Sequence, residues 1–173
     1  MVVPGLLQTR AYASAIIRGG EPSLPDDEVE QRIELRMARQ EILSRKSTPP
    51  TVWCVLDESV LYRRAKDPAV LAEQLERLIK LGELPNVHIQ VLPFDAFGLH
   101  AGISGTFTLL TFGPELVGDP GVAHAETRIR SFYYEDAAHI MRYRDTWSRV
   151  QVQALSPEDS LAVLACRIKE VIA

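Results

Sequence analysis

Thr51–Leu56 has the sequence TVWCVL and Val87–Leu92 has the sequence VHIQVL, and these two stretches decide the fold. Both are short and rich in β-branched and apolar residues, which is typical of strands. Between them, Asp67-Pro68 marks a helix start, because aspartate caps helices and proline suits their first turn. Apolar residues then recur at helical spacing, at positions 71, 75, 78 and 79, and Gly82 ends the run. The middle of the chain is therefore predicted as strand, helix and strand.

Two helices are predicted before these strands. Apolar residues recur at helical spacing between positions 6 and 17, and Gly19-Gly20 ends that pattern. Asp26 is a suitable N-cap for a second helix, which the apolar positions extend to about Arg45. Pro49-Pro50 prevents this second helix from continuing.

The C-terminal half adds short strands and two helices. Thr106–Phe112 alternates like a strand, and Val122–Ala125 with Ile129–Tyr133 suggests a hairpin. One helix is predicted over Asp136–Val152, and Ser156-Pro157 begins the last one. The pattern favours an α+β fold, with a small mixed or antiparallel sheet packed with several helices and two helices at the C-terminus. We expect residues 1–173 to form a single domain.

The composition is that of an ordinary globular protein. Of the 173 residues, 46% are hydrophobic and 24% charged, which excludes disorder, collagen-like repeats and a disulfide scaffold. The net charge of −4 argues against nucleic-acid binding by the chain as a whole. No apolar run approaches the roughly 20 residues of a membrane helix, and Cys54 and Cys166 lie in apolar stretches as expected for buried free thiols. A cytoplasmic location without membrane contact is the expectation.

The motifs of common catalytic and cofactor sites are absent from the sequence. Its four histidines have neither metal-ligand spacing nor an accompanying GxSxG motif, and no phosphate-binding loop is present. We therefore predict no cofactor and no metal. One enzymatic alternative remains, in which Asp57, Glu58 and His100 act as acid and base groups. The structural alternative is that Asp57 caps the helix that follows it.

Two groups of residues are candidates for binding. A glycine-flanked loop and the strands beside it suggest a small-molecule pocket lined by Phe97, His100, Phe107 and Tyr133, although aromatic residues at strand spacing also form cores. On the second helix, Arg32, Arg36 and Arg39 share one face with interleaved glutamates. That face is a solvated, salt-bridged surface, a site at Arg36 and Arg39 for an acidic partner, or a set of arginines that buttress the sheet.

Several ordered blocks of the sequence together resemble a known family over nearly the whole chain. They are VPGLLQTRAYA at 3–13, RMARQEIL at 36–43, LDESVL at 56–61, QLERL at 74–78, NVHIQVLP at 86–93, GTF at 105–107 and ALSPEDS at 154–160. In this order they are similar to the C-terminal domain of actinobacterial transcriptional regulators. The N-terminal domain of these antitoxin-like regulators is a Cro/CI-type helix-turn-helix.

The resemblance implies a regulatory, partner-binding module without catalysis. DNA would be contacted only through the upstream helix-turn-helix domain. That domain is absent from this chain, either because the chain has been trimmed or because it is a free-standing domain. The implied partner is a small protein encoded nearby, and a homodimer is possible. Among the matched residues, we expect Pro4-Gly5 to set a turn, Gln40 and Gln74 to tie helices to the sheet, and Ser156 to cap the last helix.

Overall fold

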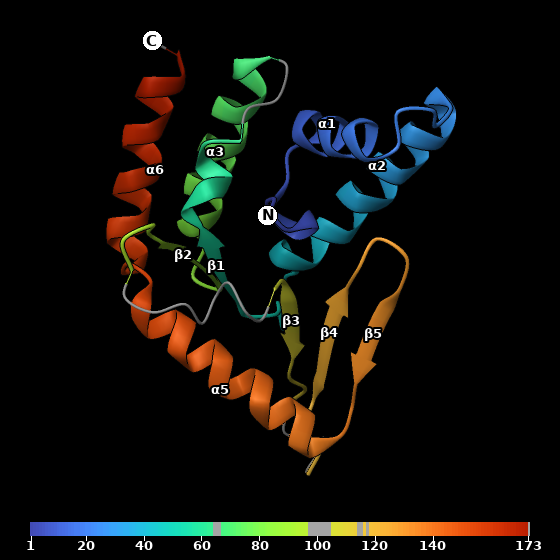
Figure 1. Ribbon diagram of the computed structural model, residues 1–173, viewed down its shortest axis with the longest axis vertical. Coiled ribbons are helices and arrows are strands. Elements are labelled where there is room, and N and C mark those ends of the chain that lie inside the picture. The colour runs from blue at the N-terminus through green and yellow to red at the C-terminus, as the bar shows by residue number, and fades with distance from the viewer. Residues whose placement is uncertain (64–66, 97–104, 114–115, 117, 173) are drawn as a thin grey trace. The chain divides into compact units, whose positions relative to one another are not determined.

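The computed structural model describes residues 1–63, 67–96, 105–113, 116 and 118–172 (Figure 1). The chain divides into two compact units. Unit 1 comprises Met1–Phe94 with Leu155–Ala173, and unit 2 comprises Asp95–Ala154. The single domain expected over residues 1–173 stays a prediction, and the two units are described separately.

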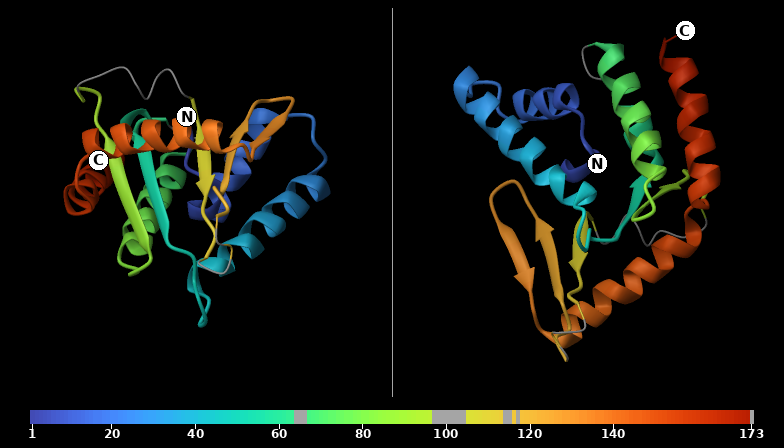
Figure 2. Two further views of the ribbon diagram at one scale, coloured as in Figure 1. Left: turned by 90° about the horizontal axis from the view of Figure 1, so that it is seen from below. Right: turned by 180° about the vertical axis from the view of Figure 1, so that it is seen from behind.

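Unit 1 holds most of the helices and a parallel pair of strands (Figure 2). Its elements are η1 Gly5–Leu7, α1 Arg10–Gly20, α2 Asp26–Gln40, η2 Glu41–Ser44, β1 Val52–Asp57, η3 Glu58–Leu61, α3 Pro68–Gly82, β2 Val87–Leu92 and α6 Pro157–Ile172. Strands β1 and β2 pair in parallel with Val52 opposite Val87. A parallel pair needs a crossover between its strands, and α3 supplies it.

Short-range capping sets where the helices of unit 1 begin. The Thr9 side chain accepts a hydrogen bond from the backbone of Tyr12, so the first α-helix starts at Arg10 instead of Leu6. Asp67 caps α3 as predicted, and Ser156 caps α6 by accepting from Asp159 N at 3.0 Å. Helix α2 ends at Gln40 and tightens into the 3-10 turn η2, earlier than the predicted end near Arg45.

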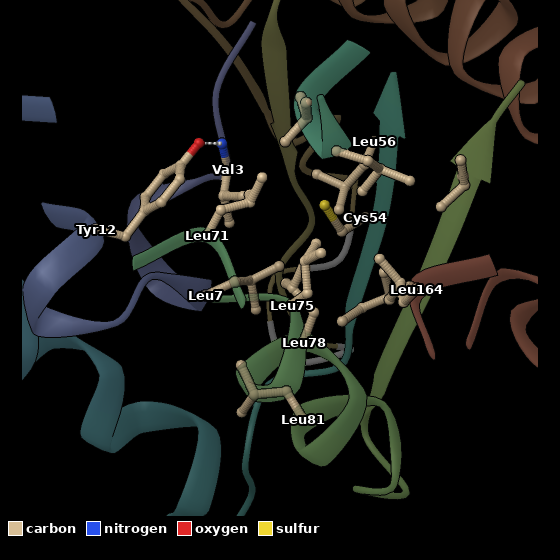
Figure 3. Close-up of a cluster of buried hydrophobic side chains, with 14 of the residues drawn as sticks. Val3, Leu7, Tyr12, Cys54, Leu56, Leu71, Leu75, Leu78, Leu81 and Leu164 are labelled. Carbon is tan, nitrogen blue, oxygen red and sulfur yellow. Dashed lines mark hydrogen bonds between the residues drawn. The ribbon is translucent and has the colours of Figure 1, made fainter. Parts of the chain in front are cut away.

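The core of unit 1 is formed by leucines of α3 packed against the strands and α6 (Figure 3). Leu71, Leu75 and Leu78 are fully buried on α3, as is Leu164 on α6. At about 25 cal/mol per Å² of apolar surface removed from water, each such leucine stabilises the fold by about 1.5–3 kcal/mol. The register of β1 and β2 places the alternate residues Cys54 and Leu56 in this core.

The described residues of unit 2 form a three-stranded antiparallel sheet and a long helix. Its elements are β3 Phe107–Leu110, β4 Val122–Glu126, β5 Ser131–Tyr134 and α5 Ala137–Gln153. The strand order is β3-β4-β5, and α5 contacts β3 and β4 (Figure 1). The predicted hairpin of β4 and β5 is confirmed, whereas the strand expected over Thr106–Phe112 extends only over Phe107–Leu110.

The predicted α+β class is confirmed. The strands form two separate sheets, one parallel and one antiparallel. Two helices, α5 and α6, lie at the C-terminal end of the sequence as expected.

Candidate functional site

The N-terminal segment before α1 is held in place by two buried glutamines. The Gln74 side chain accepts from Thr9 N and donates to Leu7 O, both at 2.8 Å. Gln40 Nε2 donates to Gly5 O at 2.9 Å and to Gln8 O at 2.8 Å. The expected link from these glutamines to the sheet is therefore wrong. They serve the N-terminal segment instead, because its irregular backbone leaves buried polar groups without partners of its own.

The arginines of α2 separate into different roles. Arg36 is half-buried, and its Nη1 donates to Gln8 Oε1 at 2.7 Å. The Arg36 side chain also packs against the N-terminal turn at Gly5. If Gly5 carried a Cβ atom, that atom would lie 3.6 Å from Arg36 Nε. Arg39 is exposed. Arg36 thus has a structural contact within unit 1, and partner binding at Arg36 and Arg39 stays a prediction.

Asp57 and Glu58, the proposed acid and base groups, have structural partners. Asp57 Oδ1 accepts from Ser59 N at 3.0 Å and caps η3, as the structural alternative predicted. Glu58 Oε2 accepts from Phe94 N at 2.7 Å, and its Oε1 accepts from the Tyr62 hydroxyl at 3.3 Å. His100, the third member of the proposed set, lies outside the described residues. Acid–base chemistry by this set stays a prediction.

Phe107 and Tyr133, two of the four predicted pocket residues, lie on opposite faces of the antiparallel sheet. Phe107 is directly opposite Ala125, which is opposite Phe132, so these three side chains share one face. Tyr133 is opposite His124 and therefore belongs to the other face. The sheet does not bring Phe107 and Tyr133 together. Phe97 and His100, the remaining pocket residues, lie outside the described residues.

The face that carries Phe107 is partly covered by α5. The ring centroids of Phe107 and Tyr143 lie 5.0 Å apart, and those of Tyr134 and Tyr143 lie 5.6 Å apart. Partial burial is the larger cause that raises the pKa of Tyr143, and the neighbouring Tyr134 raises it further. Ala123 is completely buried on this side. These aromatic contacts hold the helix on the sheet.

The opposite face of the same sheet is open and largely apolar. We call it the outer sheet face and define it by Thr108, Leu110, Val122, His124 and Tyr133. Leu110 is 45% exposed and Tyr133 is 66% exposed. The rings of His124 and Tyr133 lie 4.7 Å apart, so the two side chains form one aromatic surface. The register also places Ser131 and the exposed Glu126 on this side of the sheet, at the hairpin end.

Sequence reasoning missed a buried arginine in α6. The Arg167 guanidinium lies 4.2 Å from the centre of the Tyr62 ring, and its Nε donates to Leu61 O at 3.1 Å. Partial loss of hydration and, to a lesser degree, the neighbouring Glu58 carboxylate raise the pKa of Tyr62, which is 46% exposed. Its burial could have been predicted from helical spacing. Arg167 lies three residues after Leu164 and four before Val171, and therefore on the face of the helix that the apolar residues indicate to be buried. The contacts indicate a structural role, tying α6 to η3.

The two thiols differ in exposure, and this gives a testable prediction. Cys54 is buried as expected, and burial raises its pKa to about 12, whereas Cys166 is exposed, contrary to expectation. The thiolate is the reactive species, so Cys54 stays protonated and shielded at pH 8. We expect a thiol reagent at pH 8 to label one cysteine per folded chain and two in denaturant. Loss of native labelling in Cys166→Ser confirms the assignment, and rapid native labelling of Cys54 contradicts it.

The described part of the chain shows neither a metal centre nor a membrane span. Histidine, cysteine and carboxylate side chains nowhere gather in groups of three or more that could hold a metal ion within the described residues. Among the described helices, none is long and apolar enough to cross a membrane.

Comparison with known proteins places the chain in a family defined by its sequence. A family model described as "Domain of unknown function (DUF5753)" matches residues 1–166. The chain therefore belongs to the DUF5753 family, and the match covers both structural units. The searches of curated proteins and of solved structures found no match.

Proposed function

We propose that this DUF5753 chain is a non-catalytic regulatory module that binds a partner protein through the outer sheet face. The observation that carries the proposal is the exposure of Leu110 and Tyr133 on one side of a sheet whose other side is packed against α5. In the proposed setting, the module belongs to an antitoxin-like helix-turn-helix transcriptional regulator in the cytoplasm. An upstream domain contacts DNA, and the module receives a small protein encoded nearby.

The composition of the outer sheet face supports protein binding. Interfaces are enriched in tyrosine and depleted of charged residues at their centres, with polar residues at the rim. The face has an aromatic pair at its middle, and the exposed Glu126 borders it at the end of β4. Grouped apolar side chains on a monomer surface commonly mark interaction sites.

The surroundings of the carboxylates support the non-catalytic part of the proposal. Both Glu58 oxygens accept hydrogen bonds that hold neighbouring structure, and Asp57 caps η3. A general base needs an oxygen available to a substrate proton. The alternative of a small-molecule pocket has less support, because Phe107 and Tyr133, two of its four predicted lining residues, lie on opposite faces of the sheet.

A charge placed on the outer sheet face tests the proposal. We expect Leu110→Arg to weaken binding of the small protein encoded nearby by about tenfold or more, because an interface centre excludes an unpaired charge. The matched control is Met141→Arg, which changes an apolar side chain that is 69% exposed on α5. Binding is measured by titration with the purified small protein, and the circular dichroism of each variant checks its folding. If Leu110→Arg and the wild type bind equally well, or if Met141→Arg alone weakens binding, the outer sheet face is not the binding site.

A further inference from the structure

Strand β5 forms an edge of the antiparallel sheet and, although it is only four residues long, lacks the residue types that usually protect edges. Within the described residues it pairs with β4 on one side only. Natural edge strands commonly carry lysine, proline or an inward-pointing charge, which discourage pairing with another chain. Ser131–Tyr134 has the sequence SFYY and contains none of these. Phe132 is 41% exposed and Tyr133 66% exposed, so apolar surface accompanies the open edge.

The hairpin fixes which backbone groups of β5 face outward. Thr127 N donates to Arg130 O at 2.8 Å, so Thr127 and Arg130 form a hydrogen-bonded pair at the hairpin end. In an antiparallel ladder, hydrogen-bonded pairs alternate with non-hydrogen-bonded pairs. Phe132 and Tyr134 therefore direct their backbone groups toward β4. Ser131 and Tyr133 present their N–H and C=O groups at the free edge.

We infer that β5 pairs antiparallel with β5 of a second copy of this chain, in a two-fold register centred on Tyr133. A closed two-fold interface brings the same surface of both copies together. Residues directly opposite each other must lie on the same face of the sheet. The centre of a symmetric pairing within β5 is therefore Ser131, Phe132, Tyr133 or Tyr134.

Charge complementarity selects among these four registers. When the pairing is centred on Tyr133, Arg130 of each copy lies opposite Asp136 of the other, and Ser131 lies opposite Glu135. Arg130 lies opposite Phe132 in the register centred on Ser131, opposite Tyr134 in the one centred on Phe132, and opposite Ala138 in the one centred on Tyr134. Only the Tyr133 register gives each arginine an acidic neighbour. It also pairs Phe132 with Tyr134, and aromatic cross-strand pairs stabilise sheets.

Helix α5 leaves this edge accessible. It begins at Ala137, directly after β5, and packs across the sheet against β4 and β3 (Figure 1). Pairing through the edge of β5 uses backbone groups in the plane of the sheet. The inference therefore does not depend on the outer sheet face binding a partner, and Leu110→Arg changes no residue of β5.

The test removes one outward hydrogen-bond donor. Proline at position 133 deletes the N–H that faces the free edge and leaves the hydrogen bonds to β4 intact, and proline is tolerated at such edge positions. In sedimentation velocity over a concentration series, we expect the wild type to dimerise and Tyr133→Pro to raise the dimer dissociation constant at least about tenfold, because both copies lose a hydrogen bond. Tyr133→Ala, which retains the N–H, is the control and is expected to have the smaller effect.

A cysteine scan in the Cys166→Ser background tests the register independently. The Tyr133 register places residue 133 opposite its own counterpart at a Cα separation of about 5.5 Å, which suits a disulfide. Mild oxidation is expected to give a covalent dimer of Tyr133→Cys and none of Ser131→Cys or Phe132→Cys. A wild type that stays monomeric overturns the inference, as does a dimer that forms equally in Tyr133→Pro. Cross-linking through residue 131 or 132 in place of 133 overturns the register.

Discussion

Replacing Gln74 with leucine is expected to lower the free energy of unfolding of unit 1 by about 2–6 kcal/mol. Gln74 is completely buried, and its side chain satisfies both Thr9 N and Leu7 O. Leucine occupies a similar volume but leaves this donor and this acceptor buried without a partner, at about 1–3 kcal/mol each. The N-terminal segment would then lose its link to α3.

Urea denaturation measures this effect, because each unit contains one tryptophan. Trp53 lies on β1 in unit 1 and Trp147 on α5 in unit 2. In a Trp147→Phe background, fluorescence therefore reports on unit 1 alone. Gln31→Leu is the control, because Gln31 is exposed on α2 and its replacement is expected to change stability by less than about 0.5 kcal/mol. Equal stability of Gln74→Leu and Gln31→Leu contradicts the role given to Gln74.

Gly121→Ala is expected to be the most damaging single change in unit 2. Gly121 has φ +92°, a conformation that residues with a Cβ rarely adopt. A Cβ at this position would overlap the carbonyl oxygen of Leu110, which belongs to the backbone of β3. The backbone strain alone costs about 1–3 kcal/mol, and relief of the overlap has to separate β3 from β4 at the Leu110–Val122 pair.

Gly118→Ala separates these two contributions. Gly118 has φ +85°, but a Cβ on it meets nothing within 4 Å. Urea denaturation in a Trp53→Phe background, with Trp147 as the reporter, is expected to show a loss of about 1–3 kcal/mol for Gly118→Ala and a larger loss for Gly121→Ala. If both variants lose the same stability, the overlap with Leu110 contributes nothing.

Much of the fold could be predicted because its signals are local. The cap at Asp67, the spacing of Leu71, Leu75 and Leu78, and the end near Gly82 together define α3. The hairpin of β4 and β5 also follows from neighbouring residues. The separation of the strands into two sheets depends on pairing between distant segments, and periodicity within a strand does not specify its partner.

The candidate site was harder to predict, because residue type does not determine which face of a strand is covered. Phe107 and Tyr133 both suggested a ligand pocket, but the register of β3, β4 and β5 places them on opposite faces. The sequence also gave no indication that Gln40 and Gln74 would bond to the N-terminal segment, since such contacts join residues more than 30 positions apart.

The most conspicuous block of the sequence, VPGLLQT at 3–9, has a structural explanation. Val3 and Leu7 enter the core of unit 1, and Gln40 and Gln74 satisfy the backbone between Gly5 and Thr9. Arg36 holds the Gln8 side chain on the same segment. The block is thus accounted for by folding, and the surface proposed for binding lies on a different unit of the chain.

Hydrogen–deuterium exchange of the chain, with and without the small protein encoded nearby, tests the proposed binding surface most directly. If the outer sheet face is the binding site, the partner slows exchange in residues 107–112 and 122–134, which contain β3, β4 and β5. The Arg36 and Arg39 region of α2 is then unchanged. Slowed exchange confined to α2, or a bound partner that leaves β3, β4 and β5 unaffected, would contradict the proposal.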